Sequence, residues 1–127
     1  MVPSDRKYSK EHEWVQVGED GTATVGITQF AQDQLGDIVF VELPGEGDEV
    51  NKDDVIGTIE SVKAVSEIFA PISGTIVGIN NDLEESPESV NQEPYASGWY
   101  CKMSVANNDE VEALLDADAY SKLTAED

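Results

Sequence analysis

The sequence has few of the residues on which common protein chemistry depends. Its 127 residues include one cysteine, one histidine, and seven lysines and arginines against 27 carboxylates. A single cysteine excludes an intrachain disulfide, which is compatible with a reducing compartment, and we expect a cytoplasmic location. A net charge of −20 leaves no basic stripe for phosphates, which excludes nucleic acid and disfavours anionic membrane surfaces as partners.

Long apolar runs and catalytic motifs are also missing. No hydrophobic run approaches the roughly 18 residues that indicate a transmembrane helix, and the N-terminal segment 1–6 lacks the apolar core of a secretory signal. One histidine limits any Ser-His-Asp triad to His12, and no G-x-S-x-G elbow, zinc-spaced Cys/His cluster or phosphate-binding glycine loop occurs. We therefore expect a protein that is not an enzyme.

The acidic residues are scattered along the chain, and lysine is scarce. Such a charge has two interpretations. It either steers the protein toward basic docking faces on partners, or it is a salt adaptation in which concentrated salt screens the repulsion between carboxylates. The scatter favours salt adaptation, so we expect a halophilic character.

Short β-branched segments separated by turn residues predict a mainly β fold with helices at the edges, in one domain over residues 1–127 whose termini are partly flexible. Strands are expected at 13–17, 22–27, 37–43, 55–60, 64–70, 73–79 and 99–105. Helical segments are expected at 29–35, near 90 and over 109–115, and the last of these can extend toward residue 120. Thr28 and Gly36 are expected to cap the first helix, Ser86 the second, and an Asp109/Glu112 capping box the third. In the 99–105 strand, Cys101 falls on the apolar face and is expected to be buried.

Lys63 lies where a turn residue is expected. The segments before and after it, 54–61 and 64–70, both favour strands, yet the connection between them is Val62-Lys63-Ala64 and contains no Asn, Asp or Gly. A hairpin tip that lacks good turn chemistry is often a functional tip. An exposed amine there, one of six lysines in the chain, is suited to acylation by a cofactor such as lipoic acid or biotin. A simple solvated lysine is the alternative.

Several separated segments resemble the glycine cleavage system H protein family. The attachment segment is Ile59-Glu-Ser-Val-Lys-Ala-Val-Ser-Glu67, followed by Ala70-Pro-Ile-Ser-Gly74. Further similar segments lie at 8–15, 26–36, 39–44 and 94–99, so that the resemblance covers about residues 6–123. It implies a lipoyl-domain-like, flattened barrel-sandwich hybrid of two antiparallel sheets, each three-stranded, with short peripheral helices and a C-terminal helix.

The resemblance also implies a function. Lys63 would carry lipoic acid in amide linkage and act as a carrier, not a catalyst, in glycine catabolism. The arm would receive an aminomethyl group from a glycine decarboxylase, deliver it to an aminomethyltransferase, and return electrons to dihydrolipoyl dehydrogenase. A lipoate ligase or lipoyl transferase would attach the group. The loaded arm would fold back into a cleft on the carrier, which would shield the adduct from water.

Three carboxylates are candidates to act near the arm by their place in the matching motifs: Glu60, Glu67 and Glu13. Gln34 occupies a position where relatives carry histidine. Two alternatives stay open from the residues alone. One is a biotin carrier or a lipoyl domain of a 2-oxoacid dehydrogenase. Val62 and Ala64 argue against the biotin carrier, because biotinyl sites usually place methionine on both sides of the lysine. Val62 and the N-terminal segment 8–43 argue against the dehydrogenase domain, which usually has an acidic residue just before the lysine and belongs to a longer chain. The other is a β interaction module without a cofactor.

Overall fold

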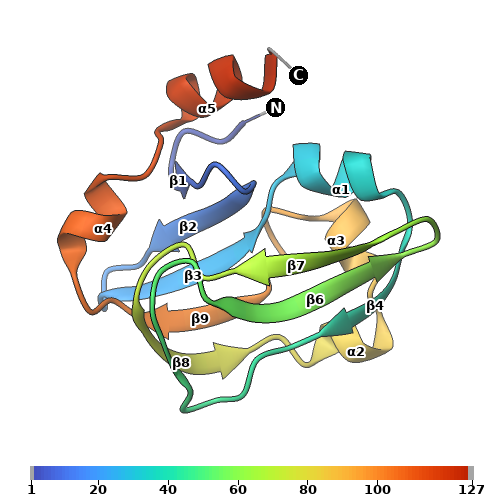
Figure 1. The fold of residues 1–127 in the computed structure, drawn as a ribbon, viewed down its shortest axis with the longest axis horizontal. Coiled ribbons are helices and arrows are strands. Elements are labelled where there is room, and N and C mark those ends of the chain that lie inside the picture. The colour runs from blue at the N-terminus through green and yellow to red at the C-terminus, as the bar shows by residue number, and fades with distance from the viewer. Residues whose placement is uncertain (1, 126–127) are drawn as a thin grey trace.

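The structure, a computed structural model, describes residues 2–125. Two antiparallel sheets pack face to face (Figure 1), one of six strands in the order β1-β2-β3-β9-β8-β5 and one of three strands in the order β4-β6-β7. The strands are β1 Lys7–Tyr8, β2 Glu13–Val17, β3 Thr22–Ile27, β4 Ile38–Glu42, β5 Glu49–Val50, β6 Val55–Ser61, β7 Val65–Phe69, β8 Gly74–Ile79 and β9 Cys101–Ser104. The helices are α1 Gln29–Leu35, α2 Asp82–Glu85, α3 Ser89–Gln92, α4 Asn108–Glu112 and α5 Ala117–Ala125.

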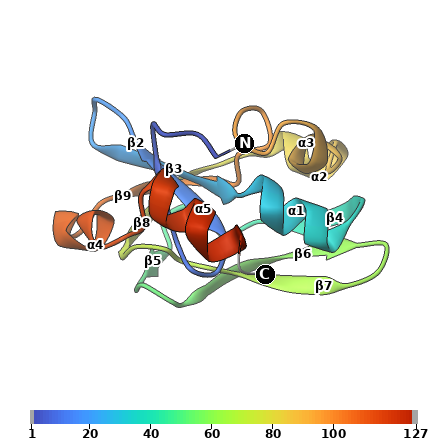
Figure 2. The ribbon, with the colours of Figure 1, turned by 90° about the horizontal axis from the view of Figure 1, so that it is seen from above.

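The predicted mainly β class with two antiparallel sheets is confirmed, and the sheets do not close into a barrel. The expectation of three strands in each sheet is wrong for the larger sheet, which has four longer strands, β2, β3, β9 and β8, and the short strands β1 and β5 at its two edges. Two-residue strands carry too little periodicity to be recognised in a sequence. Figure 2 shows the two layers from above, with α1 and α5 on the same side of the molecule.

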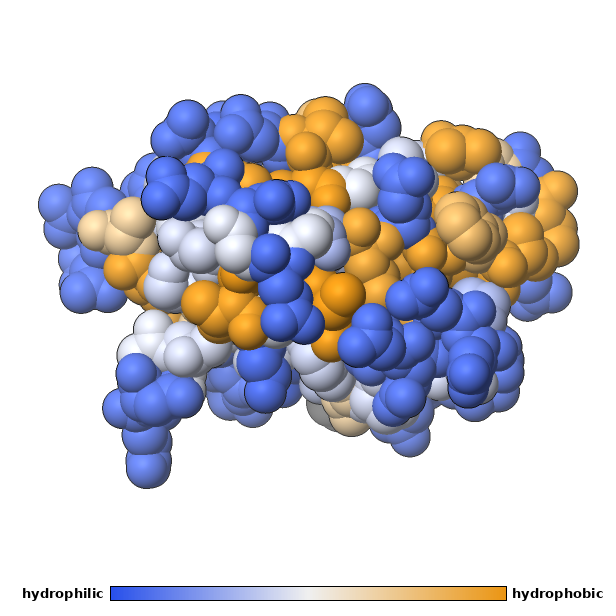
Figure 3. Space-filling model, turned by 90° about the horizontal axis from the view of Figure 1, so that it is seen from below, coloured by the Kyte–Doolittle hydropathy of each residue, from blue (hydrophilic) through white to orange (hydrophobic). Residues whose placement is uncertain are grey.

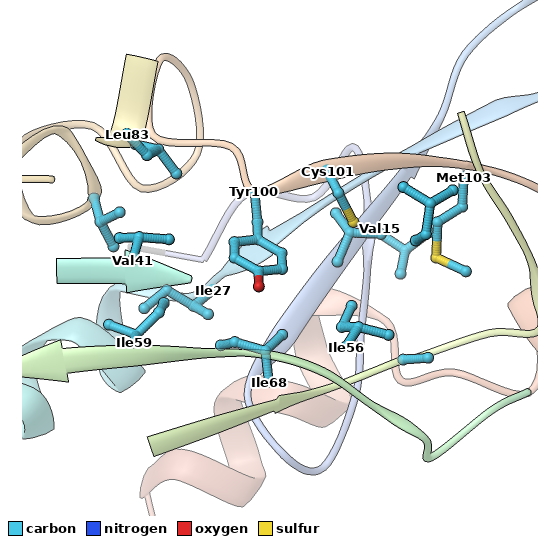
Figure 4. Packing of buried hydrophobic residues seen from close by; sticks show 14 of the residues in the cluster. Val15, Ile27, Val41, Ile56, Ile59, Ile68, Leu83, Tyr100, Cys101 and Met103 are labelled. Atoms are coloured by element: carbon cyan, nitrogen blue, oxygen red, sulfur yellow. The ribbon is translucent and has the colours of Figure 1, made fainter. Parts of the chain in front are cut away.

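The core lies between the sheets. Val15, Cys101 and Met103 of the larger sheet face Ile59 and Ile68 of the smaller one (Figure 4), and all five are at most 3% exposed. Cys101 is buried as predicted, and burial raises the pKa of its thiol to about 12. Interdigitated aliphatic side chains of this kind fix the two sheets against each other and so give the β6–β7 hairpin a rigid base.

Tyr100 corrects the predicted alternation of the 99–105 strand. Alternation over 99–105 would place Trp99 on the same apolar face as Cys101, but the strand begins only at Cys101, and Tyr100 just before it is 1% exposed. Its ring enters the core, and its hydroxyl donates a hydrogen bond to the carbonyl of Glu42 in the opposite sheet. A tyrosine needs such a partner when it is buried, and here the bond joins the two layers.

The helix α1 follows the prediction at both ends. The Thr28 side chain accepts a hydrogen bond from the N–H of Ala31, and Gly36 follows the last helical residue with φ of 83°. A positive φ of that size is open to glycine at little cost, so Gly36 ends the helix and turns the chain into β4.

The other two helix starts differ from the predictions. The helical turn near Val90 begins at Ser89 with Glu88 in the N-cap position, two residues later than an N-cap at Ser86 predicts. The predicted capping box is wrong as well, because Asn107 is the N-cap of α4 and accepts a hydrogen bond from the N–H of Asp109. Asn107, two residues before the predicted N-cap Asp109, takes the role instead, since asparagine is as good an N-cap as aspartate.

The C-terminal segment forms two helices instead of one. Leu115 breaks the helix by exchanging backbone hydrogen bonds of 2.8 Å with Tyr8, and α5 begins two residues later. The Tyr120 ring of α5 stacks on Tyr8 with their centroids 4.8 Å apart, and Trp14 completes this second apolar cluster. The last helix is therefore fastened to the N-terminal strand. Among the described residues, no helix is long and apolar enough to cross a membrane.

Candidate functional site

Lys63 lies at the tip of the β6–β7 hairpin, as predicted. The Ser61 N–H donates to the carbonyl of Ala64 at 2.8 Å, and the Ser61 hydroxyl oxygen accepts from the N–H groups of Lys63 and Ala64 at 3.3 and 3.1 Å. The Val62 N–H donates to the carbonyl of Asp37 at 3.0 Å. Ser61 therefore supplies through its side chain what Asn or Gly supply in common turns, which explains how Val-Lys-Ala can form the tip.

The side chain of Lys63 is exposed and has no ion pair with any residue in the range 2–125, where the one ion pair joins Arg6 to Asp5. Its aliphatic stem passes over Gly36: a β-carbon placed at Gly36 would lie 3.5 Å from Cε of Lys63. That distance is an ordinary van der Waals contact, so the lysine stem lies directly against the backbone at the end of α1. The amine therefore stands at the tip of a hydrogen-bonded hairpin, close to the C-terminal end of α1 and without an ion pair to any described residue.

Exposed apolar side chains surround the tip. Val62 and Val65 are 69% and 65% exposed, and Val39 and Phe40 of β4 are 48% and 52% exposed. The strand register places Phe40 beside Glu60 and Glu60 beside Val65. Figure 3 shows apolar atoms gathered at the right-hand end, which is the end of the molecule where the hairpin tip lies in Figure 1. Contiguous apolar patches on a soluble surface are typical of interaction sites.

A hollow of about 360 Å³ lies beside α1, close to the tip. Four of its residues come from the first helix and its C-terminal end, two from the turn before β2, and one from β7, and they are Phe30, Ala31, Gln34, Leu35, Glu11, His12 and Ser66. The side chain of Lys63 passes over Gly36, which is the next residue after Leu35, one of the residues that line the hollow. An extension of the lysine side chain therefore has the hollow within reach. We call it the arm pocket below.

The three predicted carboxylates lie in different environments. Glu60 and Glu67 are exposed on β6 and β7, near the tip but outside the residues that line the arm pocket. Glu13 is 2% exposed. Its carboxylate accepts hydrogen bonds from the Ser9 hydroxyl at 2.6 Å and from the Phe69 N–H at 3.3 Å. Glu13 therefore connects β2 to β7. His12 directly precedes β2 and Ser66 lies in β7, so these two strands are the ones next to the arm pocket.

Burial dominates the electrostatics of Glu13. Removal from water penalises the charged form and raises the pKa of this carboxyl from 4.5 to about 7, although the hydrogen bonds from Ser9 and Phe69 act in the opposite direction. The carboxyl of Glu13 therefore gains or loses its proton near neutral pH.

The wall residues His12, Phe30, Leu35 and Ser66 were not identified as site residues from the sequence. His12 has a φ of 72°, which no sequence pattern indicates, and Phe30 and Leu35 read as residues that only pack a helix on a sheet. Within residues 2–125, no group of three or more His, Cys, Asp or Glu side chains is placed to hold a metal ion.

Comparison with known proteins gives the same family throughout. The glycine cleavage H-protein family matches residues 6–127. The chain is 56% identical over 125 residues to a glycine cleavage system H protein of Staphylococcus epidermidis, covering 98% of both proteins, and 55% identical to that of a second strain. The crystal structure of the H protein from Mycobacterium marinum superposes with a TM-score of 0.90 and 36% identity, over 98% of this chain and 99% of the other.

The chain belongs to the glycine cleavage H-protein family. This finding decides, at the level of family, against the 2-oxoacid dehydrogenase domain, the biotin carrier and the plain interaction module. A lipoyl-carrier role within the glycine cleavage system follows from the family in general terms. The residues present fit a lipoyl group, because an exposed primary amine with no ion pair to any described residue lies beside a hollow with the apolar side chains Phe30, Ala31 and Leu35.

Proposed function

We propose that Lys63 carries lipoic acid in amide linkage and that the loaded chain shuttles an aminomethyl group from glycine decarboxylase to the aminomethyltransferase, and electrons to dihydrolipoyl dehydrogenase. The observation that carries the proposal is the amine itself: it is exposed, has no ion pair within the described residues, and stands at the tip of a hydrogen-bonded hairpin. A tethered group supplies the enzymes with a high local concentration of substrate.

The chain's own residues would position and shield the arm, and the lipoyl group would supply the redox and group-transfer chemistry. The hairpin holds the attachment point, and the stem of Lys63 leads over Gly36 toward Leu35. The apolar side chains of Phe30 and Leu35 favour the hydrocarbon part of the arm, while Gln34, Ser66 and Glu11 offer polar contacts to an amino group. Glu13, Glu60 and Glu67 remain candidates as contacts or as supports of that arrangement.

The proposal makes the chain a single carrier domain without catalytic residues, working in the cytoplasm. The exposed side chains around Lys63 are then the surface that the partner enzymes contact. A ligase or transferase that acylates Lys63 must reach the amine itself, so it has to cover Val62 and Val65. Partners that act on the far end of the arm can approach less closely.

The experiment is the exchange of the glycine carboxyl group with bicarbonate, measured with glycine decarboxylase and the lipoylated chain. Lys63→Arg keeps the charge but cannot form the amide, so exchange is expected to fall to the level without carrier. Lys52→Arg is the matched control, because Lys52 is also an exposed lysine and lies outside the hairpin. Exchange activity that survives in Lys63→Arg would refute the assignment of the attachment site.

A further inference from the structure

The C-terminal helix α5 does not line the arm pocket, but one of its side chains contacts a residue that does. Tyr120 is fully buried, and its hydroxyl lies 2.7 Å from Nδ1 of His12 and 2.7 Å from Oγ1 of Thr28. A phenol hydroxyl can donate one hydrogen bond and accept another, so a single group can serve both neighbours.

These two neighbours belong to two different segments beside the pocket, the start of α1 and the turn before β2. Thr28 is the N-cap of α1, the helix that supplies Phe30, Ala31, Gln34 and Leu35 to the pocket. His12 itself lines the pocket from the turn before β2. The Tyr120 hydroxyl therefore joins the two walls at one point, although Tyr120 itself is absent from the pocket lining.

His12 needs such support. Its φ of 72° lies in the left-handed region, which residues with a β-carbon adopt only where the surroundings hold them there. Its ring contacts the Phe30 ring, with the centroids 4.7 Å apart. The Tyr120 ring meets the same imidazole edge-on, at a ring-centroid distance of 5.7 Å. The imidazole is thus held between α1 and α5.

Phe30 has space on two sides. It lines the arm pocket and also a second hollow of about 210 Å³, to which Tyr95, Tyr120 and Thr124 contribute. A half-buried ring with space behind it can turn away from the pocket unless something holds it. The contact with His12 does so, and His12 in turn is held by Tyr120.

We propose that Tyr120 is a positioning residue for the tethered arm: its hydroxyl sets the distance between His12 and α1, and thereby how tightly the arm pocket closes on the aminomethyl-loaded group. This inference rests on the proposed function. The helix α5 contributes no residue to the pocket, but it would then determine how long the carrier protects the aminomethyl group from hydrolysis on its way between enzymes.

The reaction that this protection opposes is simple hydrolysis. Water attacks the carbon of the aminomethyl thioether, the C–S bond and the C–N bond break, and the products are the free thiol, formaldehyde and ammonia. No oxidant or reductant takes part. The rate of ammonia release from the loaded carrier, with no partner enzyme present, therefore measures how well the pocket excludes water.

The test uses Tyr120→Phe, which removes the hydroxyl and keeps the ring stacked on Tyr8. We expect the lipoylated and loaded variant to release ammonia several-fold faster than the unaltered chain. Tyr95→Phe is the matched control. The Tyr95 hydroxyl also binds the start of α1, accepting from the Gln29 N–H at 3.1 Å, but it has no bond to His12. Its release rate should stay within twofold of the unaltered chain.

A second measurement needs no lipoyl group. His12 is the single histidine, so its ring gives one set of imidazole signals in an NMR spectrum. Tyr120→Phe should weaken the nuclear Overhauser contact between the His12 and Phe30 rings, and Tyr95→Phe should not. Unchanged ammonia release in Tyr120→Phe, or equal acceleration in both variants, would overturn the inference. A chain that accepts no lipoyl group on Lys63 would instead refute the proposed function.

Discussion

Replacing Glu13 by glutamine should stabilise the protein above neutral pH. The carboxyl group is 2% exposed, and burial raises its pKa from 4.5 to about 7. Burial disfavours the charged form in the native state, so the protonated Glu13 does not lower the free energy of unfolding. The free energy of unfolding falls as the pH rises from 4.5, where the unfolded chain begins to lose this proton, and the loss is complete above pH 7, where the folded protein has lost it too.

The size of the effect follows from the same pKa values. A rise from 4.5 to about 7 corresponds to about 3 kcal/mol, at roughly 1.36 kcal/mol for each tenfold change in the ionisation constant. Glutamine is neutral at every pH and can keep both hydrogen bonds, with its oxygen accepting from Phe69 and its amide group donating to the Ser9 oxygen. The gain in unfolding free energy is therefore about 3 kcal/mol at pH 8 and under about 1 kcal/mol at pH 5.

The assay is urea unfolding of both chains at pH 5 and pH 8, with the difference in unfolding free energy taken at each pH. Glu67→Gln is the control, because Glu67 is an exposed carboxylate on β7, and its substitution should change stability by no more than about 0.5 kcal/mol at either pH. If Glu13→Gln gives the same difference in unfolding free energy at pH 5 and pH 8, the pKa of the buried carboxyl is not raised in the native state. A variant less stable than the unaltered chain at pH 8 would refute the reasoning outright.

Three further predictions test the fold and the charge. The melting temperature, followed by circular dichroism, should rise from low to multimolar potassium chloride because salt screens 27 carboxylates that face only seven lysines and arginines, and a flat profile would favour partner steering instead. Gly57→Ala should lower the unfolding free energy in urea by about 1–3 kcal/mol, since its β-carbon would collide with the bonded Tyr100 hydroxyl and Glu42 carbonyl; full stability would contradict that contact. Cys101, buried with its pKa raised to about 12, should react with a thiol reagent only after unfolding, and rapid labelling of the native protein would show that the core is open.

The sequence predicts those elements whose signals are local. Thr28 and Gly36 mark the two ends of α1 because capping chemistry involves neighbours within one turn. The strands of four or more residues between Glu13 and Ser104 follow from β-branched alternation, and the hairpin tip at Lys63 follows from two strands with a short connection. The break at Leu115 was missed because it depends on backbone pairing with Tyr8, which is distant in the sequence.

The site was predictable only at its attachment point. Lys63 is conspicuous because turn chemistry is lacking around it, whereas the substitute, the hydroxyl of Ser61, appears only with coordinates. The arm pocket draws on residues from three separate segments, and nothing in the local pattern around His12 or Ser66 connects them. Glu13 could be named from the family resemblance, but its burial and its bonds to Ser9 and Phe69 needed the fold.

Mapping the modified lysine by mass spectrometry tests the central claim most directly. The chain is incubated with lipoate, ATP and a lipoate ligase and then digested with trypsin, which does not cleave after an acylated lysine. Between Lys52 and Lys102 the sequence has no lysine or arginine except Lys63. We predict one peptide, 53–102, heavier by a single lipoyl group, while cleavage after Lys63 with the lipoyl mass on another lysine, or on none, would contradict the account.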